Sequence, residues 1–274
     1  MKKKIKIDFS DFWGGYNKTD NYFYNLLVEE FDVEISDKPD YLFFSVFGNQ
    51  HQNYNCIKIF YTGENFAPPL GYCQYSFSFD YLDDDRNYRL PHYLLYDGYY
   101  DLVNKKVDDS LLNRKFCNFV VSNGNCSERN EFFKELSKYK KVDSGGSFMN
   151  NIGYKLVDKN KWLSEYKFNI CFENDAHRGY NQHYTTEKLP QAMQSNTVGI
   201  YKGNTQIGLE FNKKSFIDIR NFKSGEEAIE YIIELDKNDD KYMEVLNQPW
   251  FVDNLIPENN KIENIKSFLY KIFK

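Results

Sequence analysis

One stretch of the chain, residues 166–204, constrains the fold more than any other. Residues 167–173 alternate in polarity and then become apolar, as expected of a buried strand. Two threonines precede residues 187–193, whose apolar side chains recur at intervals of three and four, which predicts the start of a helix. Residues 197–201 are short and rich in β-branched side chains, which predicts the next parallel strand. Ligands of such strand–helix–strand units bind beyond the carboxyl ends of the strands.

Lys188 lies in the first turn of this predicted helix. A cation there faces the positive end of the helix dipole, which is unfavourable by a few tenths of a kcal/mol. The position is explained if an anion binds both the ammonium group and the free backbone N–H groups. Pro190 places the helix start near Glu187, because proline is tolerated only where its missing N–H has no helical partner. The spacing equally allows a solvated lysine at a frayed helix end.

The first part of the chain also alternates strands and helices. Residues 5–9, 41–47 and 57–62 have strand patterns and residues 20–31 have helical spacing, so the sequence predicts a doubly wound α/β domain. Glu64 follows the last of these strands and would face the ligand crevice. A partly desolvated carboxylate at that place is a competent general base, although most glutamates in loops are simply exposed.

The pattern restarts after residues 97–113, a polar stretch that is the best candidate for a linker. Residues 116–122 predict a strand, and Ser127 is the expected N-cap of the helix that follows. Arg129 then places a second cation in a first helical turn, again against the dipole. We therefore expect Arg129, with its forked guanidinium, and Lys188, as a point charge, to bind one diphosphate.

Charge and cysteine content limit the classes of function. The net charge of −5 argues against nucleic acid as a partner, because phosphate backbones require a basic field. Five scattered cysteines without a C-x-x-C pair favour reduced thiols and a cytoplasmic location over disulfides or a zinc site. The aspartates at residues 83–85 lack ligand spacing, so we expect no metal there. Residues 261–274 are amphipathic, and we expect them to dock on the first domain, with at most weak peripheral contact at the inner face of a membrane.

Three sequence blocks carry a resemblance to a known family. Residues 172–174 read Phe-Glu-Asn, residues 184–188 read Tyr-Thr-Thr-Glu-Lys, and residues 196–203 read Asn-Thr-Val-Gly-Ile-Tyr-Lys-Gly. Together they resemble the donor motif of the α-1,3-fucosyltransferases, in particular the bacterial, Helicobacter-type members of glycosyltransferase family ten. The segment 62–91 resembles the family's stretch around its proposed general base.

The chain departs from the family pattern in three places. The loop at residues 175–183 is longer than is usual, Gly199 stands where proline is usual, and Lys202 stands where tryptophan is usual. The asparagine, tyrosine, glutamate and lysine positions of the donor motif are all kept.

The resemblance implies an α/β fold of the GT-B type, with two Rossmann-like doubly wound domains facing a central cleft. It implies an acceptor-binding domain at residues 1–113 and a GDP-fucose-binding domain at residues 114–247. Residues 248–274 would be a helical segment that returns to the first domain.

The resemblance also implies the reaction. An inverting transfer would move L-fucose from GDP-β-L-fucose to the 3-hydroxyl of N-acetylglucosamine in N-acetyllactosamine-type glycans, as in Lewis antigen-like or lipopolysaccharide O-antigen structures. Glu64 would be the general base, and Arg129 and Lys188 would neutralise charge on the leaving GDP.

Four further residues receive roles from the same resemblance. Asn174, Tyr184 and Glu187 would hold the diphosphate, ribose and fucose of the donor. Glu187 would also act in catalysis by stabilising positive charge on the sugar ring. Because relatives carry a Trp-Gly loop after their first strand, Trp13 is expected to stack on the acceptor sugar; the alternative is a packing aromatic.

No metal or other cofactor is required by this scheme, although stimulation by Mg²⁺ or Mn²⁺ is compatible with the family. Two other functions fit the same residues. One is an α-1,3/4-fucosyltransferase that acts on type 1 chains. The other is a non-catalytic sugar- or nucleotide-binding protein on the same scaffold.

Overall fold

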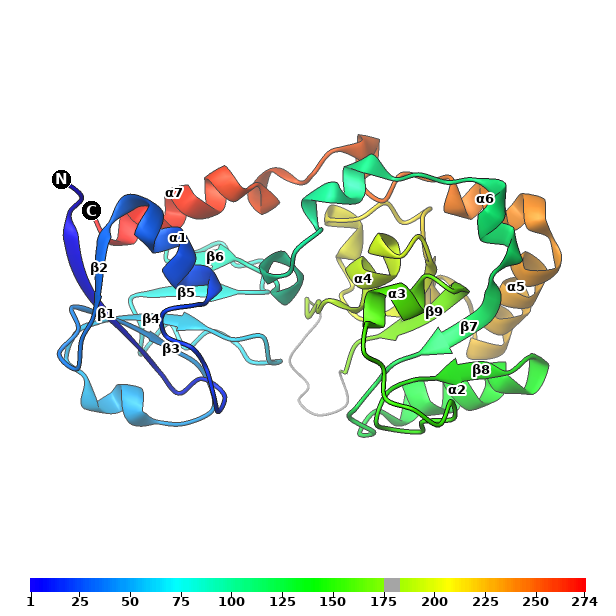
Figure 1. Ribbon diagram of the computed structural model, residues 1–274, viewed down its shortest axis with the longest axis horizontal. Coiled ribbons are helices and arrows are strands. Elements are labelled where there is room, and N and C mark those ends of the chain that lie inside the picture. Colours follow the sequence, from blue (N-terminus) through cyan, green and yellow to red (C-terminus); the bar gives the residue numbers. More distant parts are fainter. Residues whose placement is uncertain (175–182) are drawn as a thin grey trace. The chain divides into compact units, whose positions relative to one another are not determined.

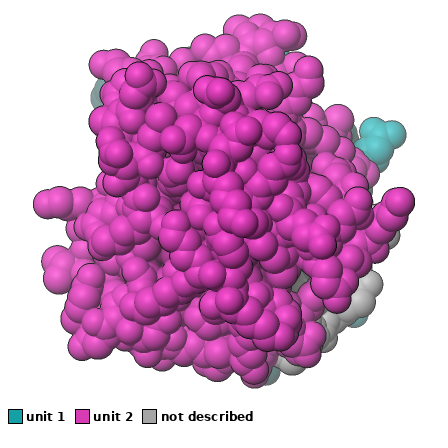
Figure 2. Space-filling model, turned by 90° about the vertical axis from the view of Figure 1, so that its right-hand side faces the viewer, with its two compact units in different colours: residues 1–95, 258–274 teal, residues 96–257 magenta. Residues whose placement is uncertain are grey.

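The computed structural model describes residues 1–174 and 183–274. It contains two compact units. Figure 1 shows their helices and strands, and Figure 2 shows the surface of unit 2, in magenta. Unit 1 comprises residues 1–95 and 258–274, and unit 2 comprises residues 96–257. The polar stretch that the sequence suggested as a linker, residues 97–113, therefore belongs to unit 2, where it carries two 3₁₀ turns (Tyr100–Asn104 and Asp109–Asn113).

Unit 1 is built on a six-stranded sheet in which all neighbouring strands are parallel. Its strands are β1 (Lys4–Ser10), β2 (Asp32–Ile35), β3 (Tyr41–Phe44), β4 (Ile57–Tyr61), β5 (Tyr75–Ser78) and β6 (Asn87–Arg89). The spatial order is β2-β1-β3-β4-β5-β6, so the direction of winding reverses between β1 and β3. In open α/β sheets, ligands bind outside the carboxyl ends of the strands at such a reversal.

Phenylalanine rings fill the core of unit 1. Phe43 of β3 has no exposed surface and stacks on Phe9 of β1, with ring centroids 5.1 Å apart. On its other side it stacks on Phe23 of α1 (Tyr22–Glu30), at 4.9 Å. Asn21 caps α1 by accepting a hydrogen bond from the backbone N–H of Tyr24. Phenylalanine side chains thus pack β1 against β3 and both strands against α1.

The C-terminal helix, α7 (Ile262–Ile272), belongs to unit 1 and lies beside α1 (Figure 1). The hydroxyl of Tyr270 donates to the backbone oxygen of Leu26 at 2.9 Å. Phe273, which follows the helix, is fully buried, and its ring packs against Phe31 and Phe43. The last residues of the chain therefore complete the core that the first residues begin.

Unit 2 is built on a five-stranded parallel sheet with the order β11-β10-β9-β7-β8. Its strands are β7 (Lys115–Phe119), β8 (Val142–Ser144), β9 (Tyr166–Phe172), β10 (Val198–Lys202) and β11 (Ile217–Asp218). Its α-helices are α2 (Ser127–Tyr139), α3 (Lys159–Leu163), α4 (Lys188–Gln194), α5 (Gly225–Lys237) and α6 (Asp239–Leu246). The winding reverses between β7 and β9, which predicts a ligand site at the carboxyl ends of these two strands.

β9 confirms the expectation of a buried central strand, because all seven of its residues are buried between β7 and β10. The expected helix and following strand are present as α4 and β10. One local expectation was wrong. Ser127 is the first residue of α2 and not its cap, because Cys126 occupies the N-cap position and makes no side-chain capping bond. Arg129 nevertheless lies in the first turn, as expected.

We predict that Phe273→Ala destabilises the protein by about 3 kcal/mol or more, because the substitution leaves a cavity in the core of unit 1. Urea unfolding followed by circular dichroism measures this loss. Lys274→Ala, at the exposed neighbouring position, serves as the control and should change the unfolding free energy by less than about 0.5 kcal/mol. Equal stability of the two variants would show that residue 273 is not part of the core.

Candidate functional site

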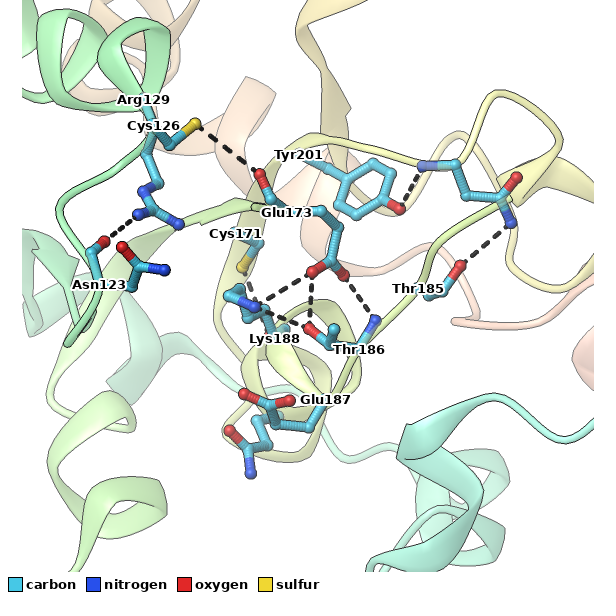
Figure 3. Close-up of polar contacts among 12 residues, drawn as sticks. Asn123, Cys126, Arg129, Cys171, Glu173, Thr185, Thr186, Glu187, Lys188 and Tyr201 are labelled. Carbon is cyan, nitrogen blue, oxygen red and sulfur yellow. Dashed lines mark hydrogen bonds and ion pairs between the residues drawn. The ribbon is translucent and has the colours of Figure 1, made fainter. Parts of the chain in front are cut away.

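The candidate site lies where the winding of unit 2 reverses. The segment after β7 carries Asn123, and the segment after β9 carries Glu173 and Asn174. Figure 3 shows that the side chains of Arg129 and Lys188 extend toward these strand ends from α2 and α4. The two cations that the sequence singled out thus come together with the ends of two adjacent strands.

Glu173 is at the centre of this arrangement (Figure 3). Its side chain is 1% exposed, and in the described part of the chain this side chain accepts its hydrogen bonds from residues near the start of α4. It accepts from the backbone N–H of Thr186 at 2.7 Å, from the Thr186 hydroxyl at 2.6 Å, and from Lys188 Nζ at 3.1 Å. A carboxylate that is buried to this degree is stable only when it is paired and hydrogen-bonded. Glu173 therefore fixes the position of α4 on the strand end.

The ammonium group of Lys188 is held by this carboxylate and not by solvent. Besides Glu173, it donates to the Thr186 hydroxyl at 2.8 Å, so two of its three protons are used within the described residues. Burial alone would lower the pKa of Lys188, but the carboxylates of Glu173 and Glu187 outweigh burial and raise it above its ordinary value. Lys188 is therefore a fixed positive charge throughout the neutral range, and the alternative of a solvated lysine at a frayed end is wrong.

Arg129 supplies the second positive charge. It is 1% exposed, donates from Nη2 to the backbone oxygen of Asn123, and lies over the ring of Phe119 with its Cζ atom 6.0 Å from the centroid. Its charge acts on Lys188, whose pKa it works to lower. Two like charges within electrostatic range disfavour each other. A bound anion would remove this repulsion, so the pair suits a diphosphate.

The other expected donor residues belong to the same strand–helix unit of the chain. Asn174 is partly buried, and its side-chain oxygen is buried without a hydrogen-bond partner in the described part of the chain. Tyr184 is 8% exposed. Glu187 is the N-cap residue of α4, and its carboxylate lies 3.9 Å from Nζ of Lys159. Of the long loop expected at residues 175–183, residues 175–182 lie outside the described residues.

Lys159, at the start of α3, is a site residue that the sequence reasoning missed. Its Nζ donates to Oε1 of Gln191 at 2.6 Å and approaches Glu187. Burial lowers the pKa of Lys159. No motif marks this lysine, because α3 is short and lies far from α4 in the sequence. The only available signal for Glu173 was its place in the Phe-Glu-Asn block.

A cavity of about 630 Å³ opens beside the ends of β7 and β8. Val120, Gly145, Gly146, Tyr154 and Lys159 are among the residues that line it. Gly146 is required there, because a Cβ atom at this position would lie 1.9 Å from the backbone oxygen of Val121. The cavity is large enough for a ring system of nucleobase size and adjoins Lys159.

The two remaining candidates, Trp13 and Glu64, lie in unit 1. Glu64 follows β4 and is exposed, and its backbone N–H donates to the Thr62 hydroxyl at 3.0 Å. The sequence suggested that the Glu64 carboxylate is partly removed from solvent, and the residues of unit 1 do not bury it. Trp13 is 46% exposed and follows β1. Contacts with neighbouring side chains therefore cover only part of the Trp13 ring, and the rest is open to a ligand.

The two departures in the last sequence block have structural explanations. Gly199 lies inside β10, where a Cβ atom would come within 2.6 Å of Cδ1 of Leu189, so glycine lets α4 pack closely on the strand. Lys202, at the end of β10, forms an ion pair with Glu128 of α2. Neither substitution removes a residue from the cluster around Glu173.

No group of three or more histidine, cysteine or carboxylate side chains is placed to hold a metal ion in residues 1–174 and 183–274. Within the same ranges, every helix is too short or too polar to cross a bilayer.

We predict that Glu173→Gln destabilises the protein by about 3 kcal/mol, because it removes the carboxylate that Lys188 contacts and leaves the charge of this largely buried lysine less well balanced. Urea unfolding at pH 7 measures the change. Glu128→Gln is the matched control: it breaks the more exposed ion pair with Lys202, which should cost less than about 1 kcal/mol. If both substitutions had the same small effect, the buried pair would not stabilise α4.

Comparisons with known proteins agree with this geometry. Residues 7–96 match a model described as the alpha-(1,3)-fucosyltransferase FucT N-terminal domain. Residues 112–264 match the model of the C-terminal part of glycosyltransferase family 10 (fucosyltransferase). The chain is 33% identical to the alpha-(1,3)-fucosyltransferase FucT of Helicobacter pylori, with 88% of this chain and 59% of that protein aligned.

The alignment with a second relative is shorter. The 3-galactosyl-N-acetylglucosaminide 4-alpha-L-fucosyltransferase of Bos taurus is 34% identical over 47% of this chain and 35% of its own length. This chain therefore spans less than two thirds of the length of either relative.

A solved structure extends the match to the whole fold. The crystal structure of an alpha1,3-fucosyltransferase with GDP-fucose is 29% identical and superposes with a TM-score of 0.83, covering 100% of this chain and 91% of that one. This agreement confirms the expected α/β fold of the GT-B type. With the family model matched over more than half of the chain, the protein belongs to glycosyltransferase family 10, the fucosyltransferases.

Proposed function

We propose that this protein is an inverting α-1,3-fucosyltransferase. It transfers L-fucose from GDP-β-L-fucose to the 3-hydroxyl of N-acetylglucosamine in N-acetyllactosamine-type glycans, such as Lewis antigen-like or O-antigen chains. The observation that carries this proposal is the pair of fixed cations, Arg129 and Lys188, at the winding reversal of unit 2. Family membership and a similar protein whose crystal structure contains GDP-fucose support the choice of donor.

The donor is held by unit 2 in this proposal. Arg129 and Lys188 bind the diphosphate, and the cavity lined by Tyr154 and Lys159 receives the guanine base. Asn174 and Tyr184 contact the diphosphate and ribose. The side-chain oxygen of Asn174 is buried and has no partner in residues 1–174 and 183–274, so it can accept a hydrogen bond from a hydroxyl group of GDP-fucose.

The chemical step is a single displacement. Glu64 removes the proton from the acceptor hydroxyl as its oxygen forms a bond to C1 of fucose. The bond from C1 to the β-phosphate oxygen breaks, and GDP leaves with the electron pair, so a β-linked donor gives an α-linked product. Arg129 and Lys188 stabilise the negative charge that develops on GDP. Glu187 stabilises the positive charge that develops on the sugar ring.

Three further features belong to the same proposal. The two cations take the charge-neutralising role that a divalent metal has in other transferases, so activity persists in EDTA and Mg²⁺ or Mn²⁺ stimulates it at most modestly. Trp13 contacts the acceptor sugar. The protein acts in the cytoplasm, with at most weak peripheral contact at the inner face of the membrane.

A different linkage is the second candidate. The bovine relative is named as a 4-alpha-L-fucosyltransferase, which favours testing an α-1,3/4 activity on type 1 chains. A non-catalytic sugar- or nucleotide-binding protein is the third. Incubation with GDP-fucose and a panel of type 1 and type 2 acceptors separates all three. Acceptor-dependent GDP release with a 3-linked product supports the proposal, a 4-linked product supports the second candidate, and donor binding without turnover supports the third.

We predict that Glu64→Gln lowers kcat by about 10²-fold or more, because the amide cannot accept the acceptor proton. GDP affinity, measured by calorimetry, should stay unchanged because Glu64 does not belong to the donor unit. Glu34→Gln changes a glutamate of β2 that pairs with Lys4, and it should leave kcat as it is. Normal turnover of Glu64→Gln would exclude Glu64 as the base.

We predict that Lys188→Met raises the GDP dissociation constant at least about tenfold, since a charge-assisted contact to phosphate is lost. Calorimetric titration with GDP measures it. The control is Lys115→Met, which removes an exposed lysine at the amino end of β7, opposite the candidate site. An unchanged GDP affinity in Lys188→Met would contradict the diphosphate role.

A further inference from the structure

The winding of unit 1 reverses between β1 and β3, and two exposed aromatic side chains follow these strands. Trp13 follows β1 and is 46% exposed, and Phe47 follows β3 and is 51% exposed. Their rings meet edge to face, with centroids 6.5 Å apart and planes at 86°. β4, which carries Glu64 beyond its end, is the next strand in the sheet. Trp13, Phe47 and Glu64 therefore all follow the carboxyl ends of neighbouring strands of one parallel sheet.

The Trp13 side of this corner is fixed by stacked rings that lead to the core. Trp13 packs edge to face on Tyr16 at 4.9 Å, Tyr16 stacks on Phe12 at 4.1 Å, and Phe12 contacts Phe9 of β1 at 5.9 Å. Because these contacts already hold the rings in place, little side-chain entropy would be lost when a ligand binds the exposed faces of Trp13 and Phe47. Rigid aromatic side chains are good contact residues for this reason.

The Phe47 side is fixed by Asp11. The backbone oxygen of Asp11 accepts from the N–H of Phe47 at 2.9 Å. Its carboxylate, which is 2% exposed, accepts from the N–H groups of Gln50 and His51 at 2.9 and 2.8 Å. The same carboxylate bonds Nδ1 of His51 at 2.6 Å, and the His51 ring stacks on Phe44. One residue at the end of β1 thereby holds both ends of the loop that carries Phe47.

Two backbone features, at Asp11 and at Gly48, accompany this contact. Asp11 has φ of 60°, a left-handed conformation that costs about 1 kcal/mol or more for most residues and that aspartate tolerates best after glycine and asparagine. Gly48 passes so close that a Cβ atom there would lie 2.4 Å from Oδ1 of Asp11. Such strain persists where the surroundings over-determine it, and it gathers at ligand sites.

We propose that Trp13 and Phe47 form a corner that binds a pyranose ring of the acceptor glycan, and that Asp11 is the residue that positions this corner. A pyranose has an apolar C–H face, which lies against one aromatic ring while its edge meets the other. The occupant is a sugar because the corner lies at the winding reversal of unit 1, at the same sheet edge as the carboxylate that deprotonates the acceptor. This inference rests on the proposed function, and it adds Phe47, Asp11 and Gly48 to the residues that serve it.

The corner is tested by Phe47→Leu, Phe47→Tyr and Trp13→Ala, with N-acetyllactosamine as the varied acceptor. We expect Phe47→Leu and Trp13→Ala to raise the acceptor KM at least about tenfold, while Phe47→Tyr stays within about threefold of the unaltered protein, because it keeps the aromatic face. The matched control is Tyr72→Ala, which removes a 79% exposed aromatic side chain that precedes β5 at the other end of the sheet. It should leave the acceptor KM unchanged.

The positioning role is tested by Asp11→Asn and Gly48→Ala. Both should raise the acceptor KM with a smaller change in kcat, and both should leave GDP affinity unchanged, because the donor binds unit 2 in the proposed function. Gly48→Ala keeps every hydrogen-bonding group, so it tests loop position even if Asp11→Asn does not fold. If the unaltered protein releases no GDP with any acceptor, the proposed function fails. If it is active and Phe47→Leu or Gly48→Ala keeps its acceptor KM, the corner proposal alone is overturned.

Discussion

The ion pair between the buried carboxylate of Glu173 and the partly buried Lys188 is the interaction on which the candidate site depends. It joins the end of the central strand of unit 2 to the first residue of α4, and Thr186 adds two hydrogen bonds to the same carboxylate. Such a pair contributes little net stability in general, because desolvation offsets the attraction. Here the pair mainly fixes a position. It holds the Lys188 ammonium group in one orientation at the end of β9, where little solvent reaches it.

The charge balance around this pair explains how an anion would be recognised. Glu173 pairs with Lys188, and Arg129 adds a second, buried positive charge to the cluster. Within the described residues, Lys188 donates two of its three protons, so the third can be donated to a phosphate oxygen. Glu187 and Lys159 lie next to each other and add no net charge. The site is therefore prepared for an anionic ligand without exposing a strongly basic surface, in a protein whose net charge is −5.

The two sheets share the same winding, and in both units the candidate site residues follow the strands at which the winding reverses. In each sheet the second strand lies on one side of the first and the third lies on the other. The loops that leave the first and third strands then diverge, and side chains from both line one hollow. In unit 2 these loops carry Asn123 and Glu173, and in unit 1 they carry Asp11 and Phe47. Both pairs of loops include a buried carboxylate that holds backbone N–H groups.

The parts that could be predicted from sequence are those with local signals. Apolar periodicity predicted β9 and α4, and the unfavourable placement of cations in first turns singled out Arg129 and Lys188. The parts that could not be predicted depend on partners distant in the sequence. Glu173 pairs with a residue across an undescribed loop, and Asp11 binds His51 through a contact that no periodicity encodes. The Ser127 cap was wrong because Cys126 has the non-helical backbone that a cap requires, and residue type alone does not fix this.

The most direct measurement of the central claim is a calorimetric comparison of GDP and guanosine, the same base and ribose with and without the diphosphate. We expect GDP to bind at least about 10²-fold more tightly than guanosine, because two charge-assisted contacts go to phosphate oxygens. Arg129→Met combined with Lys188→Met should remove most of this difference while guanosine affinity stays the same. If the unaltered protein bound GDP and guanosine with equal affinity, Arg129 and Lys188 would hold no diphosphate.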